Sequence, residues 1–186
     1  MSQVKCCCFD LEASSLNADF GVLLCGVVKE PGKRPVVFRG DVLNPDWQSK
    51  RSNDRELVGA LVHHLNTFDI WVVYNGLKFD LPFLRTRLAR WGLPPLPVKK
   101  LLDPYQLVRN KLKLSYSSLQ SVAALANVGK KEGLDGNVWL RASLDGDTKA
   151  MDRIVAHCIN DVRLLEKVCG IVKPYSSAFN AWGSAA

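Results

Sequence analysis

The stretch VKCCCFDLE (residues 4–12) decides how the rest of the sequence is interpreted. Its first part is β-prone and mostly apolar, which is typical of a strand covered on both faces. It ends in Asp10 and Glu12 on either side of Leu11, and because side chains alternate along a strand, both carboxylates are expected on one face of the sheet. A carboxylate without a partner at the end of an apolar strand would cost several kcal/mol or take up a proton, so the pair is a candidate functional site.

The spacing alone is a weak signal, because the sequence holds three acid-x-acid pairs: Asp10/Glu12, Asp54/Glu56 and Asp145/Asp147. The two later pairs lie in polar surroundings and need no functional explanation. The first pair differs because it ends an apolar strand, although a strand end that emerges into solvent explains it equally well at this point.

The remaining pattern alternates strands and helices. Strands are expected over residues 4–11, 21–30, 35–39, 70–74 and 98–103, and the turn at 31–33 makes the first three an antiparallel meander. Helices are expected from Ser52 and Asn53 onward and over residues 81–91, 104–111, 117–126 and 147–172. The segment 129–144 is rich in Gly, Lys and Asp, so we expect a connecting loop, with Trp139 and Leu140 as its apolar anchors.

The composition fits one domain over residues 1–173, followed by a tail over residues 174–186. Of the 186 residues, 47% are apolar and 23% are charged, which excludes a disordered, collagen-like or coiled-coil chain. Lys and Arg outnumber Asp and Glu by 25 to 18, and the resulting net charge of +7 mildly favours polyanions such as nucleic acid as partners.

The six cysteines show no CxxC spacing, and the three consecutive ones alternate across a strand, so they cannot share a metal. Buried thiols in a reducing cytosol are the expected state. No apolar run reaches the roughly 18 residues that a membrane span needs, and the first residues lack the layout of a signal peptide. The sequence therefore predicts a soluble, cytoplasmic protein without a membrane partner.

Two further motifs carry carboxylates. Asp80 ends the run NGLKFD (residues 75–80) directly after an expected strand, where open α/β sheets bind their ligands, although an ordinary helix N-cap is an equal alternative. His157 and Asp161 stand four residues apart on the last helix and so share one of its faces, although an isolated pair of this kind is usually a simple ion pair.

Asp10, Glu12, Asp80 and Asp161 together would repel one another unless cations neutralised them. Oxygen ligands favour hard ions, so we expect two divalent cations, Mg²⁺ or Mn²⁺. Two such ions about 4 Å apart serve the attack of water on a phosphodiester. The other 14 acids and the 25 basic residues leave the rest of the chain at +11, a surface that a phosphate backbone can follow.

The motifs FDLE, YNGLKFDLPFL and HCINDV occur in the order of the three motifs of the DEDD exonuclease superfamily, which this sequence resembles over residues 4–172. The second motif is most similar to the proofreading domains of family B DNA polymerases and their free-standing relatives. The resemblance implies an α/β, ribonuclease H-like fold, a mixed five-stranded sheet of three antiparallel strands then two parallel ones, with helices on both faces. It also implies a two-metal 3′–5′ exonuclease that releases nucleoside 5′-monophosphates.

Carried over by position, Asp10, Glu12, Asp80 and Asp161 would bind the metals, and His157 would be the general base. Leu16 would lie against the terminal base, and Asn75 and Phe79 would line the same pocket, with local packing as an even alternative for each. The sequence departs from the family at one point, because the base is usually a histidine five residues before the last acid or a tyrosine four before it. Here a histidine has the tyrosine spacing.

Several functions remain open at this stage. We expect single-stranded or frayed DNA as the substrate, but the residues do not separate DNA from RNA. A metal-dependent endonuclease on the same fold and a non-catalytic nucleic-acid-binding or polymerase-associated module are the alternatives. Because 186 residues leave no room for a polymerase module, proofreading would require a polymerase or another replication or repair protein as a partner.

Overall fold

The computed structural model describes residues 4–130 and 133–177 and contains one five-stranded sheet in the order β3-β2-β1-β4-β5. The central strand β1 (Cys6–Ala13) pairs antiparallel with β2 (Leu23–Lys29), which pairs antiparallel with β3 (Val36–Arg39). On its other side, β1 runs parallel to β4 (Ile70–Val72), which runs parallel to β5 (Lys100–Leu102). The mixed sheet expected from the sequence is confirmed.

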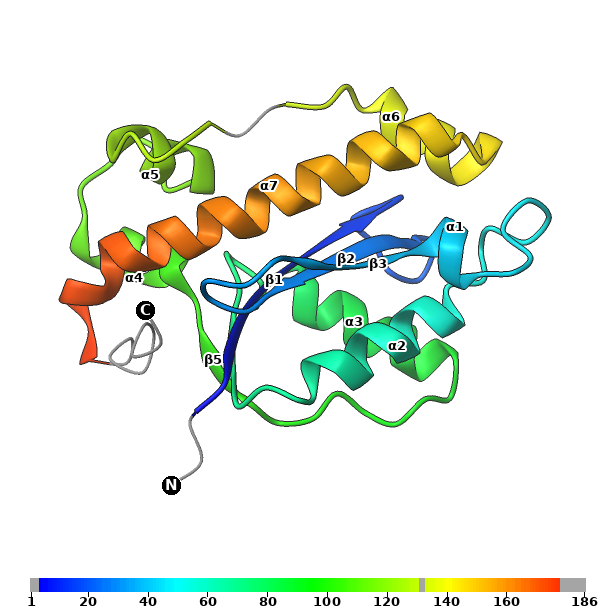
Figure 1. Cartoon of the computed structure of the whole chain (residues 1–186), viewed down its shortest axis with the longest axis horizontal. Coiled ribbons are helices and arrows are strands. Elements are labelled where there is room, and N and C mark those ends of the chain that lie inside the picture. Colours follow the sequence, from blue (N-terminus) through cyan, green and yellow to red (C-terminus); the bar gives the residue numbers. More distant parts are fainter. Residues whose placement is uncertain (1–3, 131–132, 178–186) are drawn as a thin grey trace.

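Helices cover both faces of this sheet. The helices α2 (Arg55–Leu65) and α3 (Asp80–Arg90) pack on one face, and α7 (Thr148–Val172) crosses the other (Figure 1). The helices α4 (Pro104–Lys111) and α5 (Leu119–Leu125) lie on the side of α7. None of the helices in the described part of the chain has both the length and the apolar character that a membrane crossing requires.

The alternation of side chains along β1 divides the core in two. Cys6 and Cys8 pack with α7, whereas Cys7, Phe9 and Leu11 pack with α2 and α3. All six cysteines of the chain are buried thiols, as expected, and none forms a disulfide. A strand that is apolar on both faces is therefore held between two helical layers, which fixes the direction in which its polar end points.

The segment after residue 129 is only partly a loop, so that expectation was incomplete. It contains the short helix α6 (Asn137–Leu140) and a π-helical turn over Arg141–Asp145, because Val138 and Ala142 are buried against the α7 side of the core. The remaining short elements are α1 (Gly40–Leu43) and a 3₁₀ turn over Lys173–Tyr175. Most of the expected C-terminal tail, residues 178–186, lies outside the described residues.

Asp54, which lies in polar surroundings in the sequence, is buried in the structure with an exposed fraction of 2%. Its Oδ1 lies 2.7 Å from Nη2 of Arg87 and accepts a hydrogen bond of 2.6 Å from the indole N–H of Trp91. Its Oδ2 accepts a 2.8 Å bond from the backbone N–H of Leu23. Arg87 also donates to the carbonyl of Ala18 at 3.0 Å, so one buried ion pair joins α2, α3, β2 and the loop after β1.

Candidate metal centre

The two acids of β1 lie where the sheet opens. Pairing between β1 and β4 extends only from Cys6 to Cys8, whereas pairing with β2 continues to Ala13. Asp10 and Glu12 therefore lie on a part of β1 that is not paired with β4. Both are on the same face of the sheet as Cys6 and Cys8, which is the face covered by α7. The Sγ atom of Cys158 on α7 lies 3.3 Å from Oδ2 of Asp10, which supports the expected orientation.

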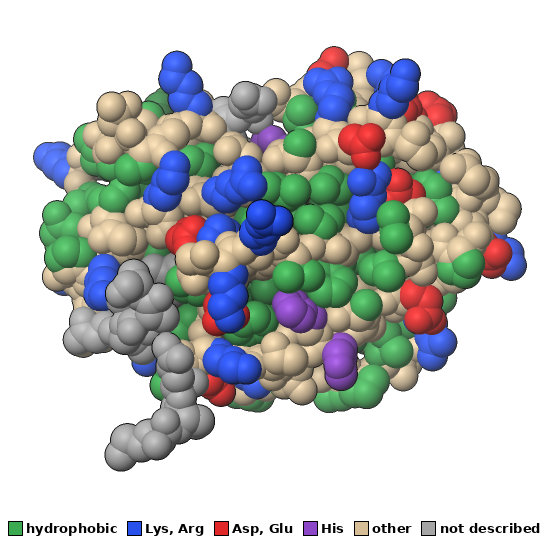
Figure 2. Space-filling model, in the orientation of Figure 1, with side chains coloured by type: hydrophobic (Ala, Val, Ile, Leu, Met, Phe, Trp, Pro, Cys, Tyr) green, Lys and Arg blue, Asp and Glu red, His purple; other side chains and the backbone are tan. Residues whose placement is uncertain are grey.

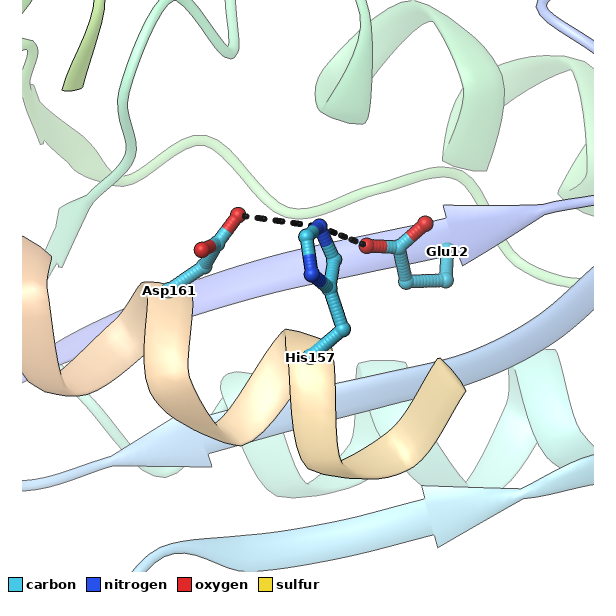
Figure 3. Close-up of side chains that lie close together, drawn as sticks. All are labelled: Glu12, His157 and Asp161. Carbon is cyan, nitrogen blue, oxygen red and sulfur yellow. Dashed lines mark ion pairs between the residues drawn. The ribbon is translucent and has the colours of Figure 1, made fainter. Parts of the chain in front are cut away.

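The helix α7 adds His157 and Asp161, one turn apart on the face that meets β1. In Figure 3, Glu12 and Asp161 point at the imidazole from opposite sides. Nε2 of His157 is 3.7 Å from Oε1 of Glu12 and 3.8 Å from Oδ2 of Asp161, and one ligand atom of each of the three residues lies within 4.8 Å of the others. His157 is 8% exposed and Asp161 3%, so this is a buried polar cluster rather than a surface ion pair.

Asp80 reaches the same region from the start of α3. It is the first residue of the helix and Phe79 occupies the N-cap position, so the alternative of an ordinary N-cap does not describe this carboxylate. A turn brings it there: Asn75 adopts a left-handed φ of 60°, and the carbonyl of Gly76 accepts a 3.0 Å bond from the N–H of Leu81.

The environment of Asp80 favours the neutral acid in the absence of a cation. Burial is the main cause that raises the pKa of Asp80, the negative charge of Glu12 adds to it, the backbone N–H groups of Asp80 and Leu11 oppose it, and the resulting pKa is about 7. Its Oδ1 has no hydrogen-bond partner among the described residues. A buried carboxylate with a spare oxygen beside a second carboxylate suits a hard divalent cation, so the residues fit a metal that Asp10, Glu12, Asp80 and Asp161 would hold.

Two hollows are lined by residues of the sequence motifs or their neighbours. Asp10 and Asp161 form part of the wall of a pocket of about 590 Å³ that is otherwise lined by Tyr74, Asn75, Tyr105, Tyr116, Ser117, Ser118, Leu119 and Gln120. Leu16 and Phe79 line a separate hollow of about 280 Å³. Asn75 thus lines the larger pocket, whereas Leu16 and Phe79 line the smaller one.

Two residues at the acids were not singled out from the sequence. The indole N–H of Trp139 donates a 2.9 Å hydrogen bond to Oε2 of Glu12, and Cys158 contacts Asp10. Trp139 was expected only to anchor a loop. The one sequence feature that could have indicated its role is the presence of an aromatic side chain in a polar segment. Cys158 could have been found from its place beside His157 in the last motif.

The comparisons with known proteins agree with this architecture. A family model of the RNase_H superfamily matches residues 7–172. Among solved structures, the fold is similar to that of the family B DNA polymerase from the hyperthermophilic archaeon Pyrobaculum calidifontis, with a TM-score of 0.75 and 19% sequence identity. The similarity covers 94% of this chain but only 25% of that polymerase, and at this identity it shows the fold alone. No curated protein matches the sequence significantly. The match over nearly all of the chain shows that the protein belongs to the RNase_H superfamily.

Proposed function

We propose that the protein is a metal-dependent 3′–5′ exonuclease that hydrolyses phosphodiester bonds at the 3′ end of single-stranded or frayed DNA and releases nucleoside 5′-monophosphates. One observation carries the proposal: Glu12 on β1 and His157 and Asp161 on α7 place ligand atoms within 4.8 Å of one another, with Asp10 in the same pocket wall as Asp161 and Asp80 close enough to Glu12 for that charge to raise its pKa. Such a cluster is electrostatically unfavourable unless cations neutralise it. A nuclease is also the activity generally associated with this fold.

The residues would divide the chemistry between them. Asp10, Glu12, Asp80 and Asp161 would hold two divalent cations, Mg²⁺ or Mn²⁺. When bound, such ions polarise the phosphate and lower the pKa of a water molecule. Nε2 of His157 would orient the attacking water and accept its proton, and the neighbouring oxygens of Glu12 and Asp161 would stabilise the imidazolium that forms.

The surroundings of the acids support a polynucleotide substrate. Leu16, which is 83% exposed, and Phe79 offer apolar contacts to a terminal base in the smaller hollow. The larger pocket exposes aromatic rings, and Arg109 stacks on Tyr105 with its Cζ 5.7 Å from the ring centroid. Aromatic rings and basic groups together favour unpaired strands. Lys and Arg side chains are spread over the face drawn in Figure 2, which offers phosphates many contacts.

One observation favours RNA as a second candidate substrate. The pocket beside Asp10 carries the polar side chains of Asn75, Ser117, Ser118 and Gln120, and such groups could bind a ribose 2′-hydroxyl. The structural likeness to a family B DNA polymerase supports the DNA assignment instead, with a polymerase as partner in proofreading.

A gel assay tests the proposal. Single-stranded DNA and RNA of matched sequence, labelled at the 5′ end, are incubated with Mg²⁺, Mn²⁺ or EDTA and with wild type, Asp10→Ala or the exposed-acid control Glu56→Ala. We expect a ladder that shortens from the 3′ end, requires metal, persists in Glu56→Ala and is absent in Asp10→Ala. A circular strand should stay intact, since its cleavage would show an endonuclease. Folded wild type that cleaves neither strand would refute the proposal and favour a binding module.

A further inference from the structure

Trp139 contacts both Glu12 and His157. Its indole N–H donates to Oε2 of Glu12 at 2.9 Å, and its ring meets the imidazole edge to face, with centroids 6.1 Å apart and an interplanar angle of 87°. The two side chains that it contacts are 127 and 18 residues away in the sequence. A single aromatic side chain thus bridges a proposed metal ligand and the proposed base.

We propose that Trp139 is a positioning residue that holds the Glu12 carboxylate in the orientation needed for metal binding; this inference rests on the proposed function. The indole takes Oε2 and leaves Oε1 facing Nε2 of His157 at 3.7 Å. An indole N–H is a hydrogen-bond donor only and does not titrate. It therefore continues to donate to the Glu12 carboxylate when the charge of the cluster changes. A free glutamate side chain loses much conformational entropy when it binds a metal. Because Trp139 already orders Glu12 before the metal binds, this entropy loss does not weaken metal binding.

The segment that carries Trp139 is anchored on both sides of the residue. Val138 and Ala142 are buried in the core on the α7 side, and the hydroxyl of Ser143 donates to the carbonyl of Trp139 at 2.8 Å. Arg51 donates to the carbonyl of Ser143 at 3.2 Å and to the carbonyl of Leu144 at 2.6 Å. The indole is therefore presented from a fixed support, which a positioning residue requires.

The chain provides a matched control for this contact. Trp91 also donates its indole N–H to a carboxylate, Oδ1 of Asp54 at 2.6 Å, but that carboxylate is paired with Arg87 in the core. Replacing either tryptophan by phenylalanine removes one N–H donor and keeps an aromatic ring. The two substitutions differ in whether the carboxylate belongs to the acid cluster.

The experiment compares wild type, Trp139→Phe and Trp91→Phe by titration with Mn²⁺, with unbound Mn²⁺ measured by electron paramagnetic resonance. Removing a hydrogen-bond partner of a metal ligand typically weakens metal binding about 10- to 100-fold, and we expect a loss of this size in Trp139→Phe. At saturating Mn²⁺ its KM for a single-stranded oligonucleotide should equal that of wild type. Trp91→Phe should lower the Tm and leave Mn²⁺ binding unchanged.

A double-substitution cycle isolates the pathway through Glu12. In a Glu12→Ala background, adding Trp139→Phe should weaken Mn²⁺ binding no further, because the carboxylate that it orients is gone. The inference would be overturned if Trp139→Phe bound Mn²⁺ as tightly as wild type, or if Trp139→Phe weakened Mn²⁺ binding as much in the Glu12→Ala background as in wild type. Either result would leave the proposed function intact. Wild-type protein that neither binds Mn²⁺ nor cleaves a strand would overturn both.

Discussion

His157 and Asp161 lie one turn apart on α7, with Nε2 of the histidine 3.8 Å from Oδ2 of the aspartate. The exonuclease superfamily that the sequence resembles usually has a histidine five residues before the last acid or a tyrosine four before it. The spacing of four keeps both groups on one helix face, and Glu12 approaches the imidazole from β1 at 3.7 Å. A histidine at the tyrosine spacing therefore still lies among the acids.

We expect His157→Ala to lower the rate of strand cleavage by about 10² to 10⁴, because a positioned general base contributes that much. Mn²⁺ binding should persist, since the carboxylates supply the ligands. Single-turnover cleavage and Mn²⁺ titration on the same preparation check both parts. If Mn²⁺ affinity falls together with the rate, the imidazole is a metal ligand and the assignment as a base is wrong.

The metal-free protein should be stabilised at pH 8 by Asp80→Asn, which also abolishes cleavage. Burial raises the pKa of Asp80 from its ordinary 3.8 to about 7, so the folded state binds this proton more tightly than the unfolded state. The resulting stabilisation is complete below about pH 4 and is lost as the pH rises through 7. Asparagine has no charge to bury at either pH.

Thermal unfolding in EDTA at pH 5 and pH 8 tests this prediction. The Tm of Asp80→Asn should exceed that of wild type at pH 8, and the difference should shrink at pH 5. Glu56→Gln, which alters an exposed acid on α2, should show no such change. An equal difference at the two pH values would contradict the argument from burial.

Gly76→Ala should damage both stability and cleavage. An added Cβ would lie 2.5 Å from Cβ and Cγ2 of Val73 and 3.0 Å from Oδ2 of Asp80. Overpacking of this kind typically costs about 1–3 kcal/mol, and here relief of the clash must move the turn that presents Asp80. Urea unfolding and Mn²⁺-dependent cleavage measure the two effects.

Gly170 provides the control for this substitution. It lies exposed within α7, and a Cβ there would meet nothing within 4 Å, so Gly170→Ala should raise stability by about 0.5–1 kcal/mol without affecting cleavage. A Gly76→Ala protein as stable and active as wild type would show that the turn tolerates a side chain, and the account of how it positions Asp80 would be incorrect.

Arg87→Met should lower the free energy of unfolding by about 3–5 kcal/mol, because it leaves the Asp54 carboxylate buried without its cation. Adding Asp54→Asn in the same chain should recover part of that loss. Lys33→Met removes the exposed pair with Glu30 and should change stability by less than about 1 kcal/mol. Urea unfolding measures these changes. If Arg87→Met lowers the free energy of unfolding by less than about 1 kcal/mol, the structural role of the pair is contradicted.

The fold was predictable because it depends on short-range patterns. The alternation along β1 placed Asp10 and Glu12 on one face, Gly92 ends α3 with a φ of 59°, and Asp147 caps α7 through the N–H groups of Lys149 and Ala150. Spacing by four placed His157 beside Asp161. Each of these features follows from the geometry of a single element.

What the sequence did not reveal depends on contacts between distant segments. Asp54 and Arg87 are separated by 33 residues and become neighbours only once α2 and α3 pack together. The contact of Trp139 with Glu12 spans 127 residues. No local sequence pattern indicates that Asp54 pairs with Arg87 or that Glu12 bonds to Trp139. These contacts therefore become visible only in the three-dimensional structure.

The early end of the pairing between β1 and β4 has a spectroscopic consequence. Beyond Cys8 the backbone of β1 faces no parallel strand, and the N–H of Leu11 is close enough to the Asp80 carboxylate to lower its pKa. The chemical shift of that amide proton, and its exchange with deuterium, therefore follow the charge and ligation of Asp80. Deuterium exchange of the β1 amides that bond to strand carbonyls reports opening of the sheet instead. Leu11 thus gives nuclear magnetic resonance a backbone signal from the acid cluster itself.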